Sequence, residues 1–386
     1  VKKMGRQKSF ICIDLKSFYA SVECVERGLD PFKANLVVAD PTRSQSTICL
    51  AITPAMKKLG VKNRCRIHEI PAGIEYITAM PRMQLYIDYS ARIYSIYLRY
   101  ISKEDIHVYS IDECFMDVTN YLSLYHMTEK EMAVELMDAV MKETGITATA
   151  GIGTNLYLAK VAMDIVAKHV DDHIGILNEI SYRQQLWDHS PLSDFWRIGS
   201  RTEKKLAGYG IHTMGDIAYT SVTSEEWLYK MFGIDAELLI DHAWGLESCD
   251  IHDIKNYHTE EHSLSNGQVL MRNYSFEEAA VVVREMTDVL VLDLVSKGLI
   301  TGSVTLWIAY DHRYERPSSH GTVRLTSLTN SSSTIMDEVD KLYQKITDRH
   351  TGIRRIEVCA NRVMPEGYLQ YDLFTDPKKK EKEKNL

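Results

Sequence analysis

Two acidic strand ends place the strongest constraint on how this 386-residue chain can fold. Residues 10–14 form a short apolar run that predicts a buried strand, and the run ends in a carboxylate. Residues 108–111 and 114–118 predict a β-hairpin, and the tight turn between them consists of Asp112 and Glu113. Each of these predicted strand ends therefore carries acidic side chains.

The elements around these strands place them in one sheet. Helices are predicted at 18–27, 83–101 and 129–143, and a strand at 147–152, while residues 31–80 form a small insert with two short strands and a helix from Pro54. Without the insert the order is β-α-β-β-α-β, the split βαβ or ferredoxin-like module. In this module the first strand and the hairpin are neighbours, so Asp14, Asp112 and Glu113 are expected at one end of the sheet.

Three carboxylates at one sheet end repel one another unless a cation lies between them. Their oxygen ligands favour Mg²⁺ or Mn²⁺ over zinc, and the sequence shows no Cys/His cluster. Two such ions can stabilise an in-line phosphoryl displacement. Any one of these acids taken alone is better explained as an ordinary turn residue. The three together favour the metal site.

The rest of the chain predicts further modules and an α+β multidomain fold. Residues 180–250 have a helical pattern, and 251–262 lack periodicity and are interpreted as a connector. A second β-α-β-β-α-β unit follows, with strands at 263–271, 301–311, 320–328 and 353–363 and helices at 275–297 and 332–347. This unit shows no sequence similarity to the first.

Composition excludes some classes of protein. The apolar fraction of 45% and the charged fraction of 25% are typical of soluble globular chains, and no run of eighteen apolar residues predicts a membrane span. Seven cysteines without a CxxC pair indicate reduced thiols in a cytoplasmic protein. The net charge of −8, taken alone, weighs weakly against a nucleic-acid partner.

Two segments resemble the signature motifs of the Y-family DNA polymerases. They are Ile-Asp-Leu-Lys-Ser-Phe-Tyr-Ala-Ser-Val-Glu at 13–23 and Tyr-Ser-Ile-Asp-Glu-Cys-Phe-Met-Asp at 109–117. The resemblance covers nearly the whole chain and is closest to UmuC-type enzymes of Gram-positive bacteria and their mobile elements.

The resemblance implies a right-hand polymerase with a split βαβ palm, small fingers, a helical thumb that contains a helix-hairpin-helix, and a βαββαβ little finger. The implied domains are the palm at 1–30 and 81–180, the fingers at 31–80, the thumb at 181–250, a linker at 251–262, the little finger at 263–370, and a clamp-binding and disordered basic tail at 371–386.

The resemblance also implies the activity, a DNA-directed DNA polymerase that performs low-fidelity translesion synthesis in DNA repair and the SOS response. Nucleotidyl transfer from a dNTP to the primer 3′-hydroxyl would use two Mg²⁺ ions, or Mn²⁺ in their place. By the resemblance, the ions bind to Asp14, Asp112 and Glu113, and the carbonyl of Leu15 completes one site.

Four residues are implied to bind the nucleotide: Phe18, Tyr19, Lys57 and Lys160. Tyr19 stands at the position of the steric gate, the aromatic that excludes a ribose 2′-hydroxyl. Lys160 ends the segment Gly-Ile-Gly-Thr-Asn-Leu-Tyr-Leu-Ala-Lys, in which Leu156 replaces a lysine of many relatives. In the insert, Pro54 and Lys57 stand where the DinB branch has tyrosine and arginine. For Lys57, a solvated helix face is an equally good interpretation.

Five residues are candidates for DNA contacts: Gly199, Arg201, Lys204, Arg324 and Arg354. The first three belong to residues 195–206, which resemble a helix-hairpin-helix with Arg197 in place of the usual second glycine. Residues 225–261 contain ten acids and two lysines, which account for the whole acidic excess of the chain. This acidic segment is predicted to point away from DNA.

The segment Gln-Tyr-Asp-Leu-Phe at 370–374 resembles the peptide that docks on the bacterial sliding clamp, with Gln370, Leu373 and Phe374 as its anchors. The expected partners are thus primer-template DNA, dNTP, the sliding clamp and accessory SOS subunits, and no membrane. A catalytically silent regulator that binds DNA and the clamp is the main alternative. A nucleotide cyclase on a similar palm is a second alternative, which leaves the clamp-like peptide unexplained.

Overall fold

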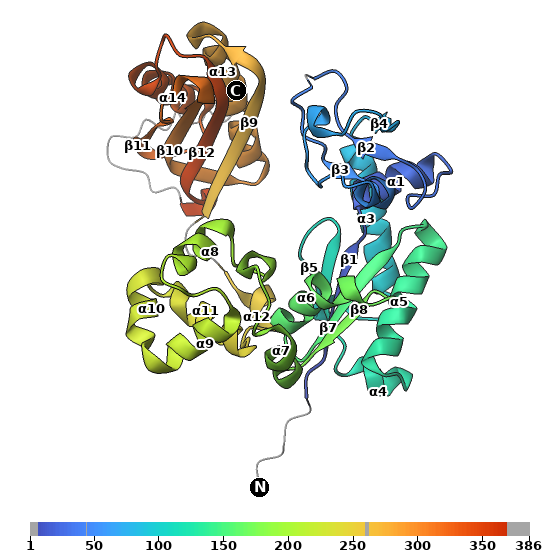
Figure 1. Ribbon diagram of the computed structural model, residues 1–386. Coiled ribbons are helices and arrows are strands. Elements are labelled where there is room, and N and C mark those ends of the chain that lie inside the picture. The colour runs from blue at the N-terminus through green and yellow to red at the C-terminus, as the bar shows by residue number, and fades with distance from the viewer. Residues whose placement is uncertain (1–6, 44, 259–261, 369–386) are drawn as a thin grey trace. The chain divides into compact units, whose positions relative to one another are not determined.

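The computed structural model describes residues 7–43, 45–258 and 262–368 (Figure 1). The chain divides into two compact units, residues 1–257 and 258–386. Each unit has its own sheets, helices and apolar core.

The central sheet of the first unit has five strands in the order β5-β6-β1-β7-β8. They are β1 (Phe10–Leu15), β5 (Ile106–Val108), β6 (Glu113–Asp117), β7 (Ala148–Gly153) and β8 (Ile174–Leu177). The first four alternate in direction, with β6 between β1 and β5, as the split βαβ module requires. The fifth strand, β8, is parallel to β7 and was not expected from the sequence.

Helices cover both faces of this sheet. Ile11, Ile13 and Leu15 of β1 pack in one core with α1 (Phe18–Glu26), α3 (Met83–Tyr97) and α5 (Glu129–Thr144). Because side chains alternate along a strand, Phe10 and Cys12 face the other way, where they pack against α6 (Leu156–Asp164). The short helix α4 (Tyr121–Tyr125) follows β6.

The insert at 31–80 folds around a small sheet of its own, in the order β3-β2-β4. The strands are β2 (Leu36–Val38), β3 (Ala51–Ile52) and β4 (Ile77–Ala79), and the last was not expected from the sequence. The helix α2 (Pro54–Lys58) begins with proline, whose fixed φ suits the first helical turn, and Thr53 caps it through the backbone N–H of Met56.

The helices expected at 180–250 are present (Figure 1), and a further helix, which the sequence did not predict, follows at 251–256. The helices are α7 (Glu179–Leu186), α8 (Ser200–Ala207), α9 (Met214–Thr223), α10 (Glu225–Phe232), α11 (Asp235–Trp244) and α12 (Ile251–Asn256). Their apolar side chains form a core that also includes Tyr157 and Leu158 of α6.

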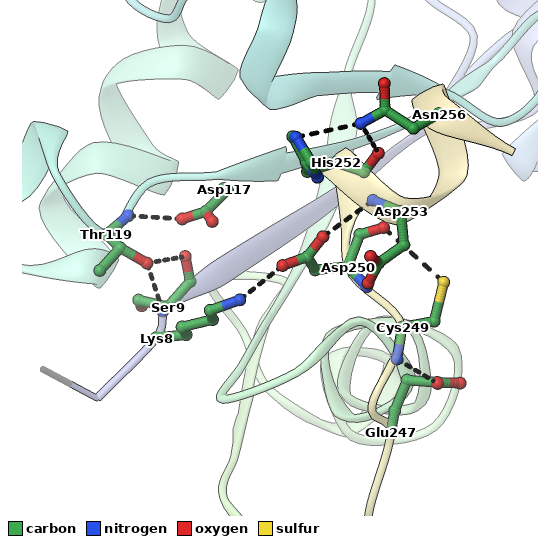
Figure 2. Close-up of polar contacts among 10 residues, drawn as sticks. All are labelled: Lys8, Ser9, Asp117, Thr119, Glu247, Cys249, Asp250, His252, Asp253 and Asn256. Carbon is green, nitrogen blue, oxygen red and sulfur yellow. Dashed lines mark hydrogen bonds and ion pairs between the residues drawn. The ribbon is translucent and has the colours of Figure 1, made fainter. Parts of the chain in front are cut away.

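The helix α12 occupies part of the segment that we interpreted as a connector. Ile251 is only 2% exposed and packs with Phe10, Cys12 and Phe115 of the central sheet. Asp250, which caps the helix, forms an ion pair of 2.6 Å with Lys8 (Figure 2). A six-residue helix is too short to show a 3.6-residue period, which explains why the sequence pattern missed it.

The second unit is a four-stranded sheet with two helices. Its elements are β9 (His262–Tyr274), α13 (Phe276–Ser296), β10 (Leu299–Tyr310), β11 (Ser319–Thr329), α14 (Ser332–Ile346) and β12 (Ile353–Pro365). The chain order β-α-β-β-α-β matches the sequence prediction, but the strand order is β11-β10-β12-β9. The last strand therefore lies between the first and second strands, whereas in the first unit the third strand, β6, lies there. Within the described ranges, no helix is long and apolar enough to cross a bilayer.

Candidate active site

The strand pairing brings the three predicted carboxylates to one end of the sheet. Asp14 of β1 is directly opposite Glu113 of β6, and both side chains lie on the face that also carries Cys12. The backbone N–H of Leu15 donates to the carbonyl of Asp112 at 2.9 Å, which ties the hairpin turn to the end of β1. Neighbouring strands thus supply Asp14 and Glu113, and the turn supplies Asp112.

Burial and mutual repulsion perturb these acids. Burial, reinforced by the charges of Asp112 and Glu113, raises the pKa of Asp14 to about 7. Burial also raises the pKa of Glu113, although Lys160 opposes the shift. Near neutral pH, Asp14 is therefore only partly ionised. A cation bound between the three acids would lower its pKa and favour the charged form.

The side chains of Cys12 and Lys160 both contact the carboxylate of Glu113. Its Oε1 accepts a hydrogen bond from Cys12 Sγ at 3.2 Å, and its Oε2 lies 2.9 Å from Lys160 Nζ. Lys160 is itself buried and also pairs with Asp164 at 3.0 Å. Burial lowers the pKa of Lys160, but the charges of Asp164 and Glu113 outweigh it and the net shift is upward. Lys160 therefore remains a cation beside the acidic cluster.

The donor set fits a hard divalent cation. Carboxylate oxygens from Asp14, Asp112 and Glu113 are the ligands that Mg²⁺ and Mn²⁺ prefer. Cys12, the soft ligand nearest to them, has its pKa raised by burial and donates a hydrogen bond to Glu113, so it stays a thiol and is a poor metal ligand. The residues present are thus suited to magnesium or manganese rather than to zinc.

A second cluster of ligand-type atoms, at the start of α12, has a structural explanation (Figure 2). Asp250 and Asp253 each accept a 3.0 Å hydrogen bond from the other's backbone N–H, which caps the helix. His252 contacts Asn256, and Asp250 also pairs with Lys8. Because these side chains serve the helix end and its ion pair, we assign no metal to them.

The two aromatic residues after the first ligand have different surroundings. Phe18 is 3% exposed in the apolar core, so its ring is not available to a nucleotide. Tyr19 is partly buried and its ring stacks on that of Tyr86, with centroids 4.4 Å apart. The hydroxyl of Tyr86 donates to the buried carboxylate of Glu23 at 2.7 Å, which fixes the ring beneath Tyr19. Burial raises the pKa of Tyr19, and the charge of Asp112 adds to the effect.

Several cations gather near the carboxylates. Partial burial lowers the pKa of Lys57, and Asp14 opposes that shift. Burial and the neighbouring charge of Lys57 lower the pKa of Lys16. The charge of Arg64 opposes the upward shift of the Tyr19 pKa, and Arg64 itself has a left-handed φ of 57°. Lys16 and Arg64 were not among the predicted site residues, although Lys16 directly follows Leu15 and Arg64 lies in a basic stretch.

The glycines before α6 serve helix packing. A Cβ atom on Gly151 would lie 2.0 Å from the carbonyl oxygen of Ala159. A Cβ atom on Gly153 would lie 2.2 Å from the backbone nitrogen of Ala159. Glycine at both positions lets α6 approach β7 closely, and this approach brings Lys160 to Glu113. The two glycines thus affect the site indirectly, because they determine how close α6 and its Lys160 lie to the sheet.

Two departures from the expected motifs also have a place in the fold. Leu156, which replaces a lysine of many relatives, is 3% exposed and packs with Phe10 and Cys12. Pro54 begins α2, and its ring nitrogen has no hydrogen to donate. Neither side chain can donate a hydrogen bond to a phosphate.

The helix-hairpin-helix segment is exposed where a phosphate contact was predicted. Gly199 precedes α8, and Gly199, Arg201 and Lys204 are all exposed. Arg197 has φ 70°, the left-handed conformation that the usual glycine adopts most easily. Its guanidinium lies 5.0 Å from the ring centroid of Trp196. The turn is therefore formed even though arginine replaces glycine.

The two arginines predicted to contact DNA from the second unit differ in position. Arg324 of β11 is exposed on the open face of the sheet, opposite Ser303. Arg354 is half-buried at a β-bulge of β12, whereas its neighbour Arg355 is on the open face, 5.7 Å from the ring of Trp307. Alternation along a strand cannot locate a bulge, so the sequence did not distinguish the two arginines. The predicted clamp anchors Gln370, Leu373 and Phe374 lie outside the described residues.

Comparison with known proteins identifies the family. The model of the impB/mucB/samB family matches residues 13–164, and the model of its C-terminal domain matches residues 261–373. UvrX of Bacillus subtilis, named as a UV-damage repair protein, is 30% identical over 95% of this chain and 86% of its own length. The chain belongs to this family, the Y-family DNA polymerases of the UmuC and DinB type.

Further relatives agree with this assignment. DNA polymerase IV 2 of Bacillus subtilis is 29% identical over 98% of this chain and 90% of its own length. DNA polymerase IV 2 of Halalkalibacterium halodurans is 27% identical over 95% and 88%, respectively. A Y-family DNA polymerase chimera of known structure shares the fold with a TM-score of 0.73 at 20% identity, over 92% of this chain and 99% of its own. The right-hand fold expected from the sequence is thereby confirmed.

Proposed function

We propose that this Y-family protein is a DNA-directed DNA polymerase that performs low-fidelity translesion synthesis in DNA repair and the SOS response. The observation that carries the proposal is the pairing of Asp14 with Glu113 on adjacent strands, next to Asp112 in the hairpin turn. Family membership and the DNA polymerase IV relatives support the same activity. A silent regulator has no need for three acids held together against their repulsion.

In this proposal Asp14, Asp112 and Glu113, with the carbonyl of Leu15, hold two Mg²⁺ or Mn²⁺ ions. When bound, such ions offset the charge of a triphosphate and lower the pKa of a primer 3′-hydroxyl. Two protein groups complete this arrangement. Lys160 limits the repulsion on Glu113 through their ion pair, and Cys12 orients the other oxygen of that carboxylate.

The surrounding residues would position the dNTP. Lys57 and Lys16 both lie close enough to Asp14 for its charge to affect their pKa values. Both can contact a polyphosphate as point charges. The ring of Tyr19, held on Tyr86, would pack under the sugar and exclude a 2′-hydroxyl. Phe18 can contribute only its backbone, because its ring is in the core.

We further propose that primer-template DNA contacts Gly199, Arg201 and Lys204 in the thumb and Arg324 and Arg354 in the little finger. Gly199, Arg201, Lys204 and Arg324 are exposed, which supports phosphate contacts without base readout. The sliding clamp would bind through Gln370, Leu373 and Phe374, and accessory SOS subunits are further expected partners.

The cysteines of the described chain are all free, which supports action in the reducing cytoplasm.

Primer extension tests the activity. The wild type should extend a primer on a DNA template only when Mg²⁺ or Mn²⁺ is present, and Asp112→Ala combined with Glu113→Ala should reduce extension at least a thousandfold. Asp117→Asn is the matched control, because this acid is on the same strand but only accepts a hydrogen bond from the backbone of Thr119. A wild type that binds DNA but extends no primer would instead favour the silent regulator.

A further inference from the structure

One side chain of the thumb reaches the hairpin that carries the catalytic acids. Trp196 directly precedes the helix-hairpin-helix turn, and its Nε1 donates to the hydroxyl of Tyr109 at 3.1 Å. The two rings meet edge to face, with centroids 5.8 Å apart. Tyr109 in turn donates its backbone N–H to the carbonyl of Glu113 at 3.0 Å. A thumb residue is thus joined to a catalytic acid through a single intermediate residue.

The same ring belongs to an aromatic cluster next to the ion pair of Lys160 and Glu113. Trp196 packs on Phe115 with centroids 5.9 Å apart, and Phe115 packs edge to face on Tyr109 at 5.7 Å. The ammonium of Lys160 lies 6.0 Å from the centroid of the Tyr109 ring. Lys160 and Glu113 are each only 7% exposed. The Tyr109 ring, on which Trp196 and Phe115 pack, thus lies next to a buried charge pair, and such an interaction strengthens in a dry environment.

On its own side, Trp196 is firmly held by the thumb. Arg197 lies over one face of its ring, and the ring of His242 is nearly parallel to it with centroids 6.3 Å apart. His242 is 3% exposed and stacks on Tyr157 at 3.9 Å. Because the phosphate-binding turn at Gly199 follows only three residues later, Trp196 cannot move far without moving that turn.

We propose that Trp196 is a positioning residue for the catalytic hairpin. Through Tyr109 it holds the backbone at Glu113 at a fixed place relative to the thumb turn at Gly199. The inference rests on the proposed polymerase function and deepens it, since a primer gripped by the thumb must present its 3′ end to carboxylates held within a fraction of an ångström.

A double-mutant cycle tests the proposal with Trp196→Phe, Tyr109→Phe and the double variant. Tyr109→Phe removes only the hydroxyl, and Trp196→Phe keeps an aromatic ring but removes the Nε1–H donor together with part of the indole. Each single change should lower kcat of primer extension about 3- to 10-fold, the range expected from one hydrogen bond. The KM for dNTP and the Kd for primer-template should stay within about twofold, and the double variant should be no slower than the slower single variant.

Trp187→Phe is the matched control, because the Nε1 of Trp187 donates to the carbonyl of Ala243 at 2.8 Å within the thumb. This variant also loses an indole hydrogen bond, but its kcat should not change. Multiplying effects in the double variant, or an equal loss of kcat in the control, would overturn the positioning role while the polymerase activity stands. A wild type that extends no primer would reject the proposed function itself, and the positioning role with it.

Discussion

At the residue scale, Asp14 is the group whose charge depends most on what surrounds it. Its pKa of about 7 is raised above the value of about 4 expected in an unfolded chain. A raised pKa of an acid means that the folded state binds the proton more tightly than the unfolded state. The resulting stabilisation is complete below about pH 4 and is lost as the pH rises through about 7.

The stability of the cation-free protein should therefore fall between pH 4 and pH 8, and Asp14→Asn should remove part of that fall. At pH 8 the variant should be more stable by about 2 kcal/mol, because it carries no buried charge to desolvate. Adding Mg²⁺ at pH 8 should stabilise the wild type and have little effect on the variant. Thermal unfolding in chelator and in Mg²⁺ measures both effects, with Asp117→Asn as the control. Parallel pH profiles for wild type and Asp14→Asn would contradict the account.

Tyr19 provides the second prediction at this scale. Tyr19→Ala should raise the ratio of ribonucleotide to deoxyribonucleotide incorporation roughly tenfold or more, because the stacked ring that would block a 2′-hydroxyl is lost. Single-nucleotide incorporation with matched rNTP and dNTP measures the ratio. Phe18→Leu is the control, since it changes a buried neighbour and should cost stability without altering sugar selectivity. Unchanged selectivity in Tyr19→Ala would remove the gate from the proposal.

At the scale of elements, the close approach of α6 to the sheet determines whether Lys160 can reach Glu113. Gly151→Ala should therefore destabilise the protein by about 3 kcal/mol, because its Cβ would overlap the backbone of α6 at 2.0 Å. Urea unfolding measures the loss. Gly267→Ala is the matched control in a strand of the second unit, where the new Cβ would meet no atom nearer than 3.7 Å. Equal stability of the two variants would show that α6 can retreat freely.

The sequence predicted those elements whose pattern is long enough to read. The strands around Asp14 and Glu113 were found because apolar runs end in acids, and the helix at 129–144 because of its period and its Gly145 end. The strand at Ile174–Leu177 was missed because it is four residues long and includes a glycine that α6 requires. The pairing of Lys160 with Glu113 could not be predicted, since it depends on the distance between a helix and a sheet.

The strand order of the second sheet was also beyond the sequence. Both units have the chain order β-α-β-β-α-β, and this order is compatible with either the third or the last strand between the first two. The choice depends on how helices α13 and α14 pack on the strands, which is a property of the assembled core. Chain order alone therefore predicts the elements of such a unit but leaves its topology open.

At the scale of the whole molecule, charge and partner sites are distributed unevenly. The acidic excess at 225–261 includes α10, α11 and α12, whereas the exposed cations Arg201 and Lys204 belong to α8. We expect DNA to follow the cations and to avoid the acidic helices, because phosphate contacts dominate such affinity. The prediction of a nucleic-acid partner is thus compatible with a net charge of −8.

The sliding-clamp proposal makes a prediction for the full chain. Deleting residues 370–386 should abolish clamp binding and leave distributive primer extension within about twofold of the wild type, because the proposed catalytic acids are in the other unit. Binding to an immobilised clamp and extension without the clamp measure the two properties. Leu373→Ala combined with Phe374→Ala is the narrower variant, which keeps the lysines after it. Clamp affinity that survives both changes would reject the assignment.

The small helix α12 has a consequence for how the thumb can evolve and move. The chain enters the thumb from β8 of the palm, and after α11 it returns to the palm, where Ile251 and the Lys8–Asp250 pair fasten it. The thumb is therefore an excursion with both ends anchored on one domain. The Trp196–Tyr109 hydrogen bond fastens it again between these ends and so restrains its rotation, and the segment can be exchanged for a relative's thumb as one continuous stretch of gene.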